Sequence, residues 1–415
     1  MASAVKEQER ESEQQTTEPR DRRSVTVMII LFLVFFLGVS DNQMVSPLLP
    51  RIADEFKLAP GDVGRLIGPA YALAAASVAL LVGPASDKFG RRKFLLYASI
   101  LFGVSLISVA FIRDLRTLTG VRFFTGLAAG TFSTCSIAYV GDYFPYKRRG
   151  TAMSVVQSGY FAALVLGVPV GSLLAQWRGW RSSFIAFGVL SILAFILVRF
   201  RLPVDTPQMA GEDLGDRMVR RFGNIRIVFE TRERIAAVVG AFFVSAGFVG
   251  FIYYLGSWLT KTFGLQTKQI GLVFIAVGVA SLGGSLLAGP IADRFGKRAI
   301  SIISTLVLGL ALLLMPHLTW GALLFLGFLA ASLAFAFRQG PLQALATELV
   351  PKNARGALVA TRNTASQVGI AASTAINGWL YDAYGYTAVG LFSAVLTLGA
   401  AVCILMMKEP VGTKE

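Results

Sequence analysis

Histidine, cysteine and charged residues are scarce in this 415-residue chain. It has one histidine, two cysteines and only 15% charged residues. A lone histidine, His317, cannot build a histidine-rich metal site, and neither Cys135 nor Cys403 belongs to a CxxC or Cys/His cluster that could replace one. Two cysteines also exclude a disulfide framework. We therefore expect no metal centre and no cofactor.

Apolar residues are abundant, at 54% of the chain, and they gather in long runs. About 20 consecutive apolar residues cross a bilayer as a helix, because a helix satisfies its backbone hydrogen bonds internally. The pattern predicts an all-α membrane protein with twelve transmembrane helices and both termini on one side. The expected spans are 25–49, 63–85, 94–112, 116–141, 151–176, 182–202, 235–260, 269–291, 299–316, 319–345, 356–380 and 386–407.

The formal net charge of +15 comes from 39 lysines and arginines against 24 acidic residues. Most of the basic residues fall in the predicted loops on the side of the termini, and cytoplasmic loops carry such an excess. We therefore expect cytoplasmic termini and attribute the charge to topology, with no nucleic-acid partner. The absence of an N-x-[ST] sequon agrees with a bacterial inner membrane.

Two polar segments divide the chain. Residues 1–24 lack apolar content and are expected to form a disordered cytoplasmic tail, and 203–234 is expected to be a basic cytoplasmic linker at the membrane surface. The expected domains are thus an N-terminal six-helix bundle at 25–202, a C-terminal bundle at 235–408 and a short tail at 409–415.

The two halves share an internal repeat. GPASDKFGRRK at 83–93 returns as GPIADRFGKRA at 289–299, an offset of 206 residues. The same offset carries Asp142 in DYFPYKRRG onto Glu348 in ELVPKNARG. This repeat predicts two pseudo-symmetric bundles related by an axis along the membrane normal, with a transport site between them.

The repeated signature, together with Arg122 in LTGVRFFTGLAAG, resembles the major facilitator superfamily. Pro47 and Pro50 in SPLLPRI, predicted to end the first span, and the glycine-rich LGVPVGS resemble its 12-span drug:proton antiporter branch. The resemblance implies the MFS fold, a monomer, and alternating access by rocking of the two bundles.

The repeated loops are candidates for gating. Gly83 and Pro84 are predicted to break the second helix, and arginines that follow can pair with acids such as Asp142. The resemblance implies a cluster that holds the cytoplasmic ends shut, while the alternative is a basic loop that only sets topology. The predicted gating residues are Gly83, Asp87, Gly90, Arg91, Arg92, Asp142, Asp293, Arg298 and Glu348.

Four ionisable residues lie inside the predicted spans, namely Asp41, Arg122, Arg338 and Arg362. Such residues are functional candidates because burying each charge in a bilayer costs about 2.5–3.5 kcal/mol. Asp41 and Arg122 lie at similar distances from the outer ends of their spans, so they can pair. We expect Asp41 to carry a proton, the alternative being a structural ion pair.

Arg338 and Arg362 would attract an anionic group if they face a central cavity; alternatively they reach the interface or pair with Glu348. Polar residues on one face of the eleventh span and three residues elsewhere complete the predicted binding site, although the aromatic residues among them can instead pack in the core. These residues are Asn363, Gln367, Thr374, Asn377, Gln157, Tyr254 and Trp258.

No G-x-x-x-x-G-K-[ST] motif is present, so a gradient must supply the energy. The favoured function is a secondary active transporter, not an enzyme, that exports small amphipathic compounds or metabolites in exchange for protons. The alternative is a uniporter, exchanger or symporter of an organic anion or zwitterion. A receptor without transport activity, or a hydrolase within the membrane, is less favoured because neither a further folded domain nor a nucleophile–base pair is evident. The expected partners are a small-molecule substrate, protons and the lipid bilayer.

Overall fold

The computed structural model describes residues 22–204, 225–351 and 354–407. The described residues form helices joined by short turns, which confirms the all-α prediction. The predicted C-terminal tail, most of the N-terminal tail and the centre of the linker lie outside the described residues.

The first half contains the helices that were predicted as six spans, with the fifth interrupted by a five-residue π-helix, η2. The bounds are α2 (Arg22–Phe56), α3 (Pro60–Phe89), α4 (Arg91–Ser108), η1 (Val109–Phe111), α5 (Leu115–Tyr143), α6 (Tyr146–Gln157), α7 (Gly159–Ala162), η2 (Ala163–Gly167), α8 (Val168–Arg178) and α9 (Trp180–Arg201).

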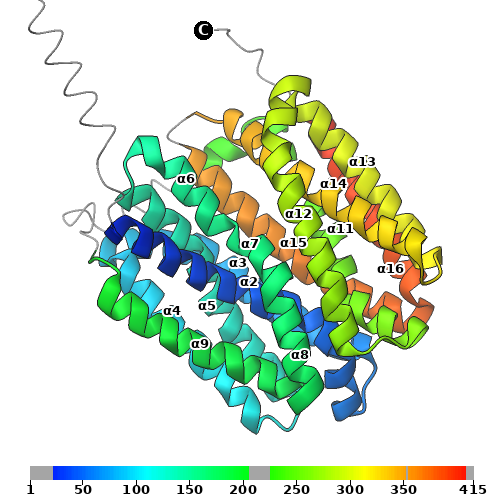
Figure 1. Ribbon diagram of the computed structural model, residues 1–415. Helices are drawn as coiled ribbons and strands as arrows, with labels where there is room; N and C mark the ends of the chain where they lie inside the picture. The colour runs from blue at the N-terminus through cyan, green and yellow to red at the C-terminus, as the bar shows by residue number, and fades with distance from the viewer. Residues whose placement is uncertain (1–21, 205–224, 352–353, 408–415) are drawn as a thin grey trace, which may run out of the picture.

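The second half repeats this order with fewer interruptions. Its bounds are α11 (Arg232–Phe263), α12 (Thr267–Phe295), α13 (Lys297–Leu314), η3 (Met315–His317), α14 (Ala322–Glu348), α15 (Arg355–Tyr384) and α16 (Tyr386–Met406). Figure 1 shows the two halves side by side, the first in blue to green and the second in yellow-green to red.

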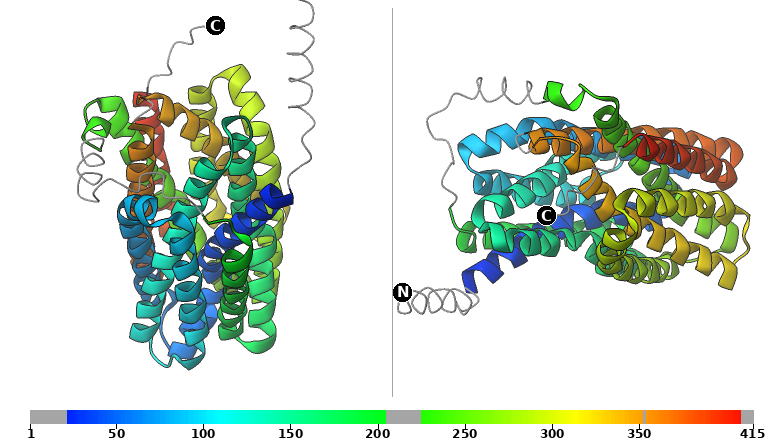
Figure 2. Two further views of the ribbon diagram at one scale, coloured as in Figure 1. Left: turned by 90° about the vertical axis from the view of Figure 1, so that its left-hand side faces the viewer. Right: turned by 90° about the horizontal axis from the view of Figure 1, so that it is seen from above.

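Within the described residues, ten helical segments are long and apolar enough to cross a membrane, and α3 makes an eleventh if its two parts are counted together. Those parts, Pro60–Val78 and Leu81–Phe89, meet at an angle of 48°. The remaining long helix is α15, which carries the polar face recognised in the sequence and packs between α3 and α11. The arrangement is that of the predicted twelve-helix fold, which Figure 2 shows from two further directions.

Two predicted helix ends are wrong. The helix α2 continues through Pro47 and Pro50 to Phe56, and α3 continues past Gly83 and Pro84 to Phe89. Proline is tolerated inside a membrane helix where neighbouring helices and local adjustment satisfy the freed carbonyl groups. The bend in α3 lies before Gly83, so these residues do not break the helix.

Turn geometry confirms that the halves are duplicated units. Gly90, between α3 and α4, has φ 93° and ψ 128°, while Gly296, between α12 and α13, has φ 91° and ψ 132°. Gly179 and Gly385, also 206 residues apart, have φ 81° and 78°. Only glycine adopts these positive φ values readily, so the same residue recurs at the same turn.

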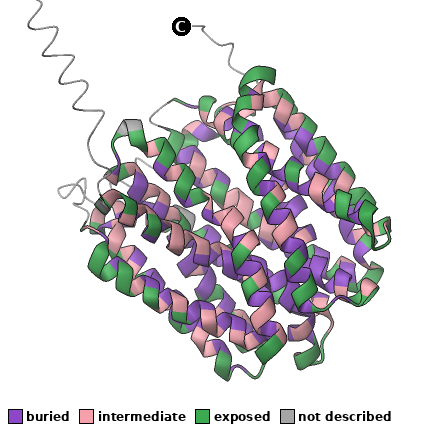
Figure 3. Cartoon of the chain, in the orientation of Figure 1, coloured by how far each residue is buried: buried purple, intermediate pink, exposed green. Residues whose placement is uncertain are grey.

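The halves meet along three helix pairs, with α3 on α15, α2 on α11, and α8 on α12. We call the end of the molecule at Gly90 and Gly296 the basic end, and the end at Lys57 and Gly264 the opposite end. Buried residues concentrate between helices, and exposed apolar residues cover the outer faces (Figure 3). One cluster of buried apolar residues includes members of both halves.

Candidate functional site

Hydrogen bonds join the two halves at the opposite end. The backbone N–H of Gly61, at the start of α3, donates to Asp382 Oδ1 on α15 at 3.0 Å. Arg51 Nε on α2 donates to Thr267 Oγ1 on α12 at 2.8 Å. An acceptor carboxylate at a helix N-terminus is favourable because the first backbone N–H groups of a helix lack partners within it. The opposite end is therefore closed by polar contacts between the halves.

Glycines allow these helices to approach closely. A Cβ atom on Gly256 of α11 would lie 2.1 Å from the carbonyl oxygen of Ser46 on α2. A Cβ atom on Gly61 would lie 2.1 Å from the carbonyl oxygen of Gly378 on α15. Both distances are impossible for a real side chain, so the closed arrangement requires glycine at these positions.

Equivalent ion pairs form in both halves, made by predicted gating residues together with Lys297, which was not predicted. Arg91 binds Asp142 on α5 and lies 2.8 Å from Asp87 Oδ1 through Nη2. Lys297 Nζ binds Glu348 Oε1 on α14 at 2.6 Å. Each member of the second pair stands 206 residues after its counterpart. The duplicated sequence motif thus encodes a duplicated ion pair, with Lys297 in place of an arginine.

A second repeated contact fixes the neighbouring helix. Arg92 donates to the carbonyl oxygen of Arg199 at the end of α9, and Arg298 donates to that of Leu405 at the end of α16. Asp293, by contrast, is exposed. These repeated contacts each join two helices of the same half, so they brace the helix ends within a bundle. Gating by this cluster stays a prediction.

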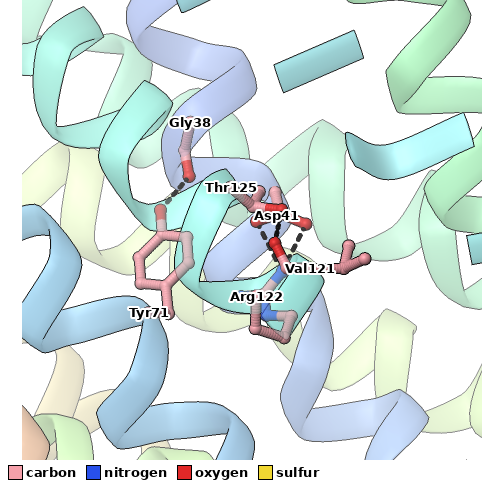
Figure 4. A network of polar contacts seen from close by, with 6 residues as sticks. All are labelled: Gly38, Asp41, Tyr71, Val121, Arg122 and Thr125. Atoms are coloured by element: carbon pink, nitrogen blue, oxygen red, sulfur yellow. Dashed lines mark hydrogen bonds and ion pairs between the residues drawn. The ribbon is translucent and has the colours of Figure 1, made fainter. Parts of the chain in front are cut away.

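Asp41 and Arg122 are joined in the interior of the first half (Figure 4). Arg122 Nη1 lies 2.8 Å from Asp41 Oδ1 and 2.7 Å from Oδ2. The two side chains are 0% and 1% exposed. A buried carboxylate would be very costly without its guanidinium, and a single nitrogen supplies the whole contact.

The surroundings leave part of this pair unsatisfied. The ring of Tyr71 lies 4.6 Å from Arg122 Cζ, and its hydroxyl donates to Gly38 O at 3.0 Å (Figure 4). Arg122 Nε and Nη2 have no hydrogen-bond partner among the described residues, and neither does the hydroxyl of Tyr253 on α11 of the other half. Tyr253 interacts electrostatically with both members of the pair. The pair therefore borders the second half and retains free donors.

Arg338, on α14, is a further buried charge whose hydrogen bonds are unsatisfied among the described residues. Its side chain is 0% exposed, and Nε, Nη1 and Nη2 have no hydrogen-bond partner in the part of the chain that the structure describes. The ring centroid of Phe335 lies 5.8 Å from its Cζ. Placing an arginine within a membrane span costs about 2.5–3.5 kcal/mol. Because of this cost, Arg338 is a functional candidate.

A stack of three aromatic rings that includes Phe335 crosses the boundary between the halves. Tyr160 of α7 stacks on Phe335 with centroids 5.8 Å apart, and Phe335 stacks on Phe248 of α11 at 4.1 Å. Gln43 Nε2 on α2 donates to the Tyr160 hydroxyl at 3.0 Å. Sequence analysis missed these four residues. Gln43 offered a signal, as an amide inside an apolar run, but the aromatic residues do not differ from core residues in sequence.

Arg362 differs from Arg338, although the sequence suggested one role for both. Its Nη1 donates to Gln343 Oε1 at 2.7 Å and its Nε to the carbonyl oxygen of Ala237 at 3.3 Å. Glu348, the partner considered from sequence, binds Lys297 instead. Arg362 is therefore anchored within the second half by these two hydrogen bonds. Its role as a substrate ligand stays a prediction.

Three other predicted binding residues serve as packing contacts. Trp258 stacks on Tyr386 with centroids 4.7 Å apart, and the Tyr254 hydroxyl donates to Thr374 O at 2.7 Å. Asn377 is buried with its amide directed at Ser393 of α16, at 3.4 Å. Trp258, Tyr254 and Asn377 fill the closed opposite end because aromatic and small polar residues pack well between helices.

The remaining predicted ligands are more accessible. Gln157 and Asn363 are exposed, and Gln367 is half-buried. Thr374 is buried and donates to Ile370 O, a contact within α15. Among the described residues, no cluster of three histidine, cysteine or acidic side chains is placed to hold a metal ion. Substrate contact by any of the predicted binding residues stays a prediction.

Comparison with known proteins agrees with this architecture. The family model described as Major Facilitator Superfamily matches residues 31–267 and 237–415. An uncharacterized MFS-type transporter of Bacillus subtilis, YwfA, is 29% identical over 400 residues, covering 92% of this chain and 93% of that protein. The cis,cis-muconate transport protein of Acinetobacter baylyi is 24% identical over 394 residues, covering 90% and 91%. The chloramphenicol resistance protein of Streptomyces lividans is 28% identical over 309 residues, covering 74% and 77%.

Solved structures share the fold. The xylose transporter XylE of E. coli, in a partially occluded inward-open conformation, matches with a TM-score of 0.77 at 18% identity, covering 95% of this chain and all of that one. The family match extends over most of the chain, and the repeat and the two six-helix bundles have the expected form. The chain belongs to the Major Facilitator Superfamily and is a multi-pass secondary transporter of small molecules, not an enzyme.

Proposed function

We propose that this transporter is proton-coupled and exports small amphipathic compounds or metabolites, with Asp41 as the proton-carrying group. The observation that supports this proposal is the buried Asp41–Arg122 pair, in which one guanidinium nitrogen neutralises both carboxylate oxygens. A carboxylate held by so few contacts is sensitive to hydration and to any movement of its neighbours. It can therefore exchange a proton when the access side changes.

Tyr253 provides the connection to the second half. It belongs to α11, whereas Asp41 and Arg122 belong to the first half, and all three interact electrostatically. Rocking of the bundles moves Tyr253 relative to the pair and changes which donors Asp41 can reach. Protonation of Asp41 releases Arg122, whose donors then become available to other acceptors. Proton binding and bundle position thereby become linked.

The proposed orientation places the basic end and both termini in the cytoplasm of a bacterial cell, following the positive-inside rule. In that orientation the contacts Gly61–Asp382 and Arg51–Thr267 close the periplasmic side. We therefore propose an inward-facing transporter that acts as a monomer. Opening to the outside must break these contacts.

The relatives support small organic molecules as the class of substrate. The Streptomyces protein is named for chloramphenicol resistance and the Acinetobacter protein for cis,cis-muconate transport, and both compounds are small organic molecules. Resistance to a compound is consistent with its export, so the export direction follows the Streptomyces relative. The assignment to the drug:proton antiporter branch also belongs to this proposal.

The test measures substrate-evoked currents in proteoliposomes on a solid-supported membrane, at two external pH values. Asp41→Asn should abolish the pH-dependent current, because the amide cannot carry a proton. Asp54→Asn, an exposed acid on the same helix, is the matched control and should behave like the unmodified protein. Transport by Asp41→Asn that still depends on pH would contradict the proposal.

A further inference from the structure

The Arg338 guanidinium presents several hydrogen-bond donors and no local acceptor. All three of its nitrogens are buried and lack partners within the described residues. Asp41, on α2, does not neutralise it, since both oxygens of that carboxylate bind Arg122. A buried guanidinium with free donors is complementary to an oxygen-bearing anion, which it can bind through two parallel hydrogen bonds.

Tyr160 contributes one more donor to the same place. Its hydroxyl oxygen accepts from Gln43 Nε2 at 3.0 Å, which directs its own proton elsewhere. Tyr160 and Arg338 interact electrostatically, and the Tyr160 ring stacks on Phe335, three residues before Arg338 on α14. The two side chains thus offer donors from opposite halves of the transporter.

The depth of this cluster suits a transported ligand. Arg338 lies 10 residues before Glu348, the last residue of α14, or about 15 Å along the helix. That distance is half of a hydrocarbon core of about 30 Å. Tyr160 and Gln43 belong to the first half, whereas Arg338 and Phe248 belong to the second. A ligand held here would be released when the bundles separate.

We propose that Arg338 and Tyr160 bind the carboxylate of an organic acid, whose apolar body packs against Phe335 and Phe248. This inference rests on the proposed transport function and narrows its cargo to amphipathic organic anions. The stacked rings at 4.1 Å supply a flat apolar wall beside the charged group, so a planar unsaturated or aromatic acid fits better than a hydrated inorganic ion.

The experiment compares equilibrium binding of benzoate and benzamide to the purified full-length protein by isothermal titration calorimetry. The two probes share shape and size and differ in charge. Benzoate should bind about ten- to hundredfold more tightly, as expected for hydrogen bonds to a charged group. Arg338→Gln should remove this preference, and Arg338→Lys should restore part of it. Tyr160→Phe keeps the ring stack and should weaken benzoate binding by about tenfold.

Arg234→Gln is the matched control, an arginine whose hydrogen bonds to Leu349 O and Ile227 O are made within its own half, and it should leave benzoate affinity unchanged. Equal affinity for benzoate and benzamide, or full benzoate affinity in Arg338→Gln, would overturn the proposal. Chloride binding at Arg338 with the same affinity as benzoate would also overturn the proposal. Binding at equilibrium needs no proton gradient, so Asp41→Asn should still bind benzoate while losing its pH-dependent current. Failure of proton coupling and failure of the anion site are thereby distinguished.

Discussion

Ser46 and Ile252 occupy equivalent positions in the two halves, 206 residues apart, and are hydrogen-bonded to each other through Ser46 Oγ and Ile252 O. Equivalent residues of a duplicated protein can touch only near the axis that relates the halves. The crossing of α2 and α11 at this bond therefore lies beside the pseudo-symmetry axis. It is a natural place for the bundles to pivot.

Gly256→Ala should favour opening of the opposite end. The added Cβ would lie 2.1 Å from Ser46 O, and overpacking of this kind costs about 1–3 kcal/mol against the closed arrangement. Double electron–electron resonance between spin labels on Asp54→Cys and Lys268→Cys, at two exposed positions, measures the separation of the halves. This distance should increase in Gly256→Ala. Gly120→Ala, where nothing lies within 4 Å of the new atom, is the control. An unchanged distance distribution in Gly256→Ala would refute a closed contact at this glycine.

The Asp41–Arg122 pair should show strong coupling in a double-mutant cycle. Arg122→Gln leaves a buried carboxylate without its cation and is expected to lower the free energy of unfolding by about 3–5 kcal/mol. Adding Asp41→Asn should recover part of that loss, because no uncompensated charge then remains. Thermal unfolding of the purified protein in detergent measures the four variants. Additive effects would show that the two side chains do not interact in the folded protein.

The two repeated ion pairs should differ in strength. The Arg91 side chain, which contacts Asp87 and Asp142, is 13% exposed, whereas that of Lys297, which contacts Glu348, is 28% exposed. Arg91→Ala is therefore expected to lower the melting temperature more than Lys297→Ala does. The loss in free energy of unfolding for Lys297→Ala should be about 0–1 kcal/mol, as is typical of exposed ion pairs. The charge-reversed variant Arg91→Asp with Asp142→Arg should recover stability relative to Arg91→Asp. If both alanine variants melt at the same temperature, the smaller exposure of Arg91 does not strengthen its ion pairs.

The proposed orientation predicts which positions an impermeant maleimide reaches in intact cells. Lys261→Cys, exposed at the opposite end, should be labelled from outside, and Arg294→Cys, exposed at the basic end, only after permeabilisation. Cys135 and Cys403 are buried and should contribute little background. Labelling of Arg294→Cys in intact cells would reverse the assignment of the two sides.

The sequence predicted the helical class, the two halves and the repeat because these depend on local composition and on a fixed offset along the chain. It also predicted that Asp41 and Arg122 could pair, although the depth argument used a helix end that proved wrong. The helix α2 continues through Pro47 and Pro50 to Phe56. Proline ends a helix only where no neighbouring helix compensates for the lost backbone hydrogen bond. Composition does not show which helices will be neighbours in the fold.

The roles of the other buried charges depended on tertiary structure. Arg338 and Arg362 have the same residue type and lie in similar apolar surroundings in the sequence. Within the part of the chain that the structure describes, the Arg338 nitrogens have no hydrogen-bond partner, whereas Arg362 donates to Gln343 and Ala237. Likewise, Trp258 packs at the closed end, whereas Tyr160 lies beside Arg338. Hydropathy and spacing determine which segments enter the membrane, because each segment meets the bilayer through its own side chains. Which side chains meet one another depends on how the two halves pack, and those contacts join residues far apart in the chain.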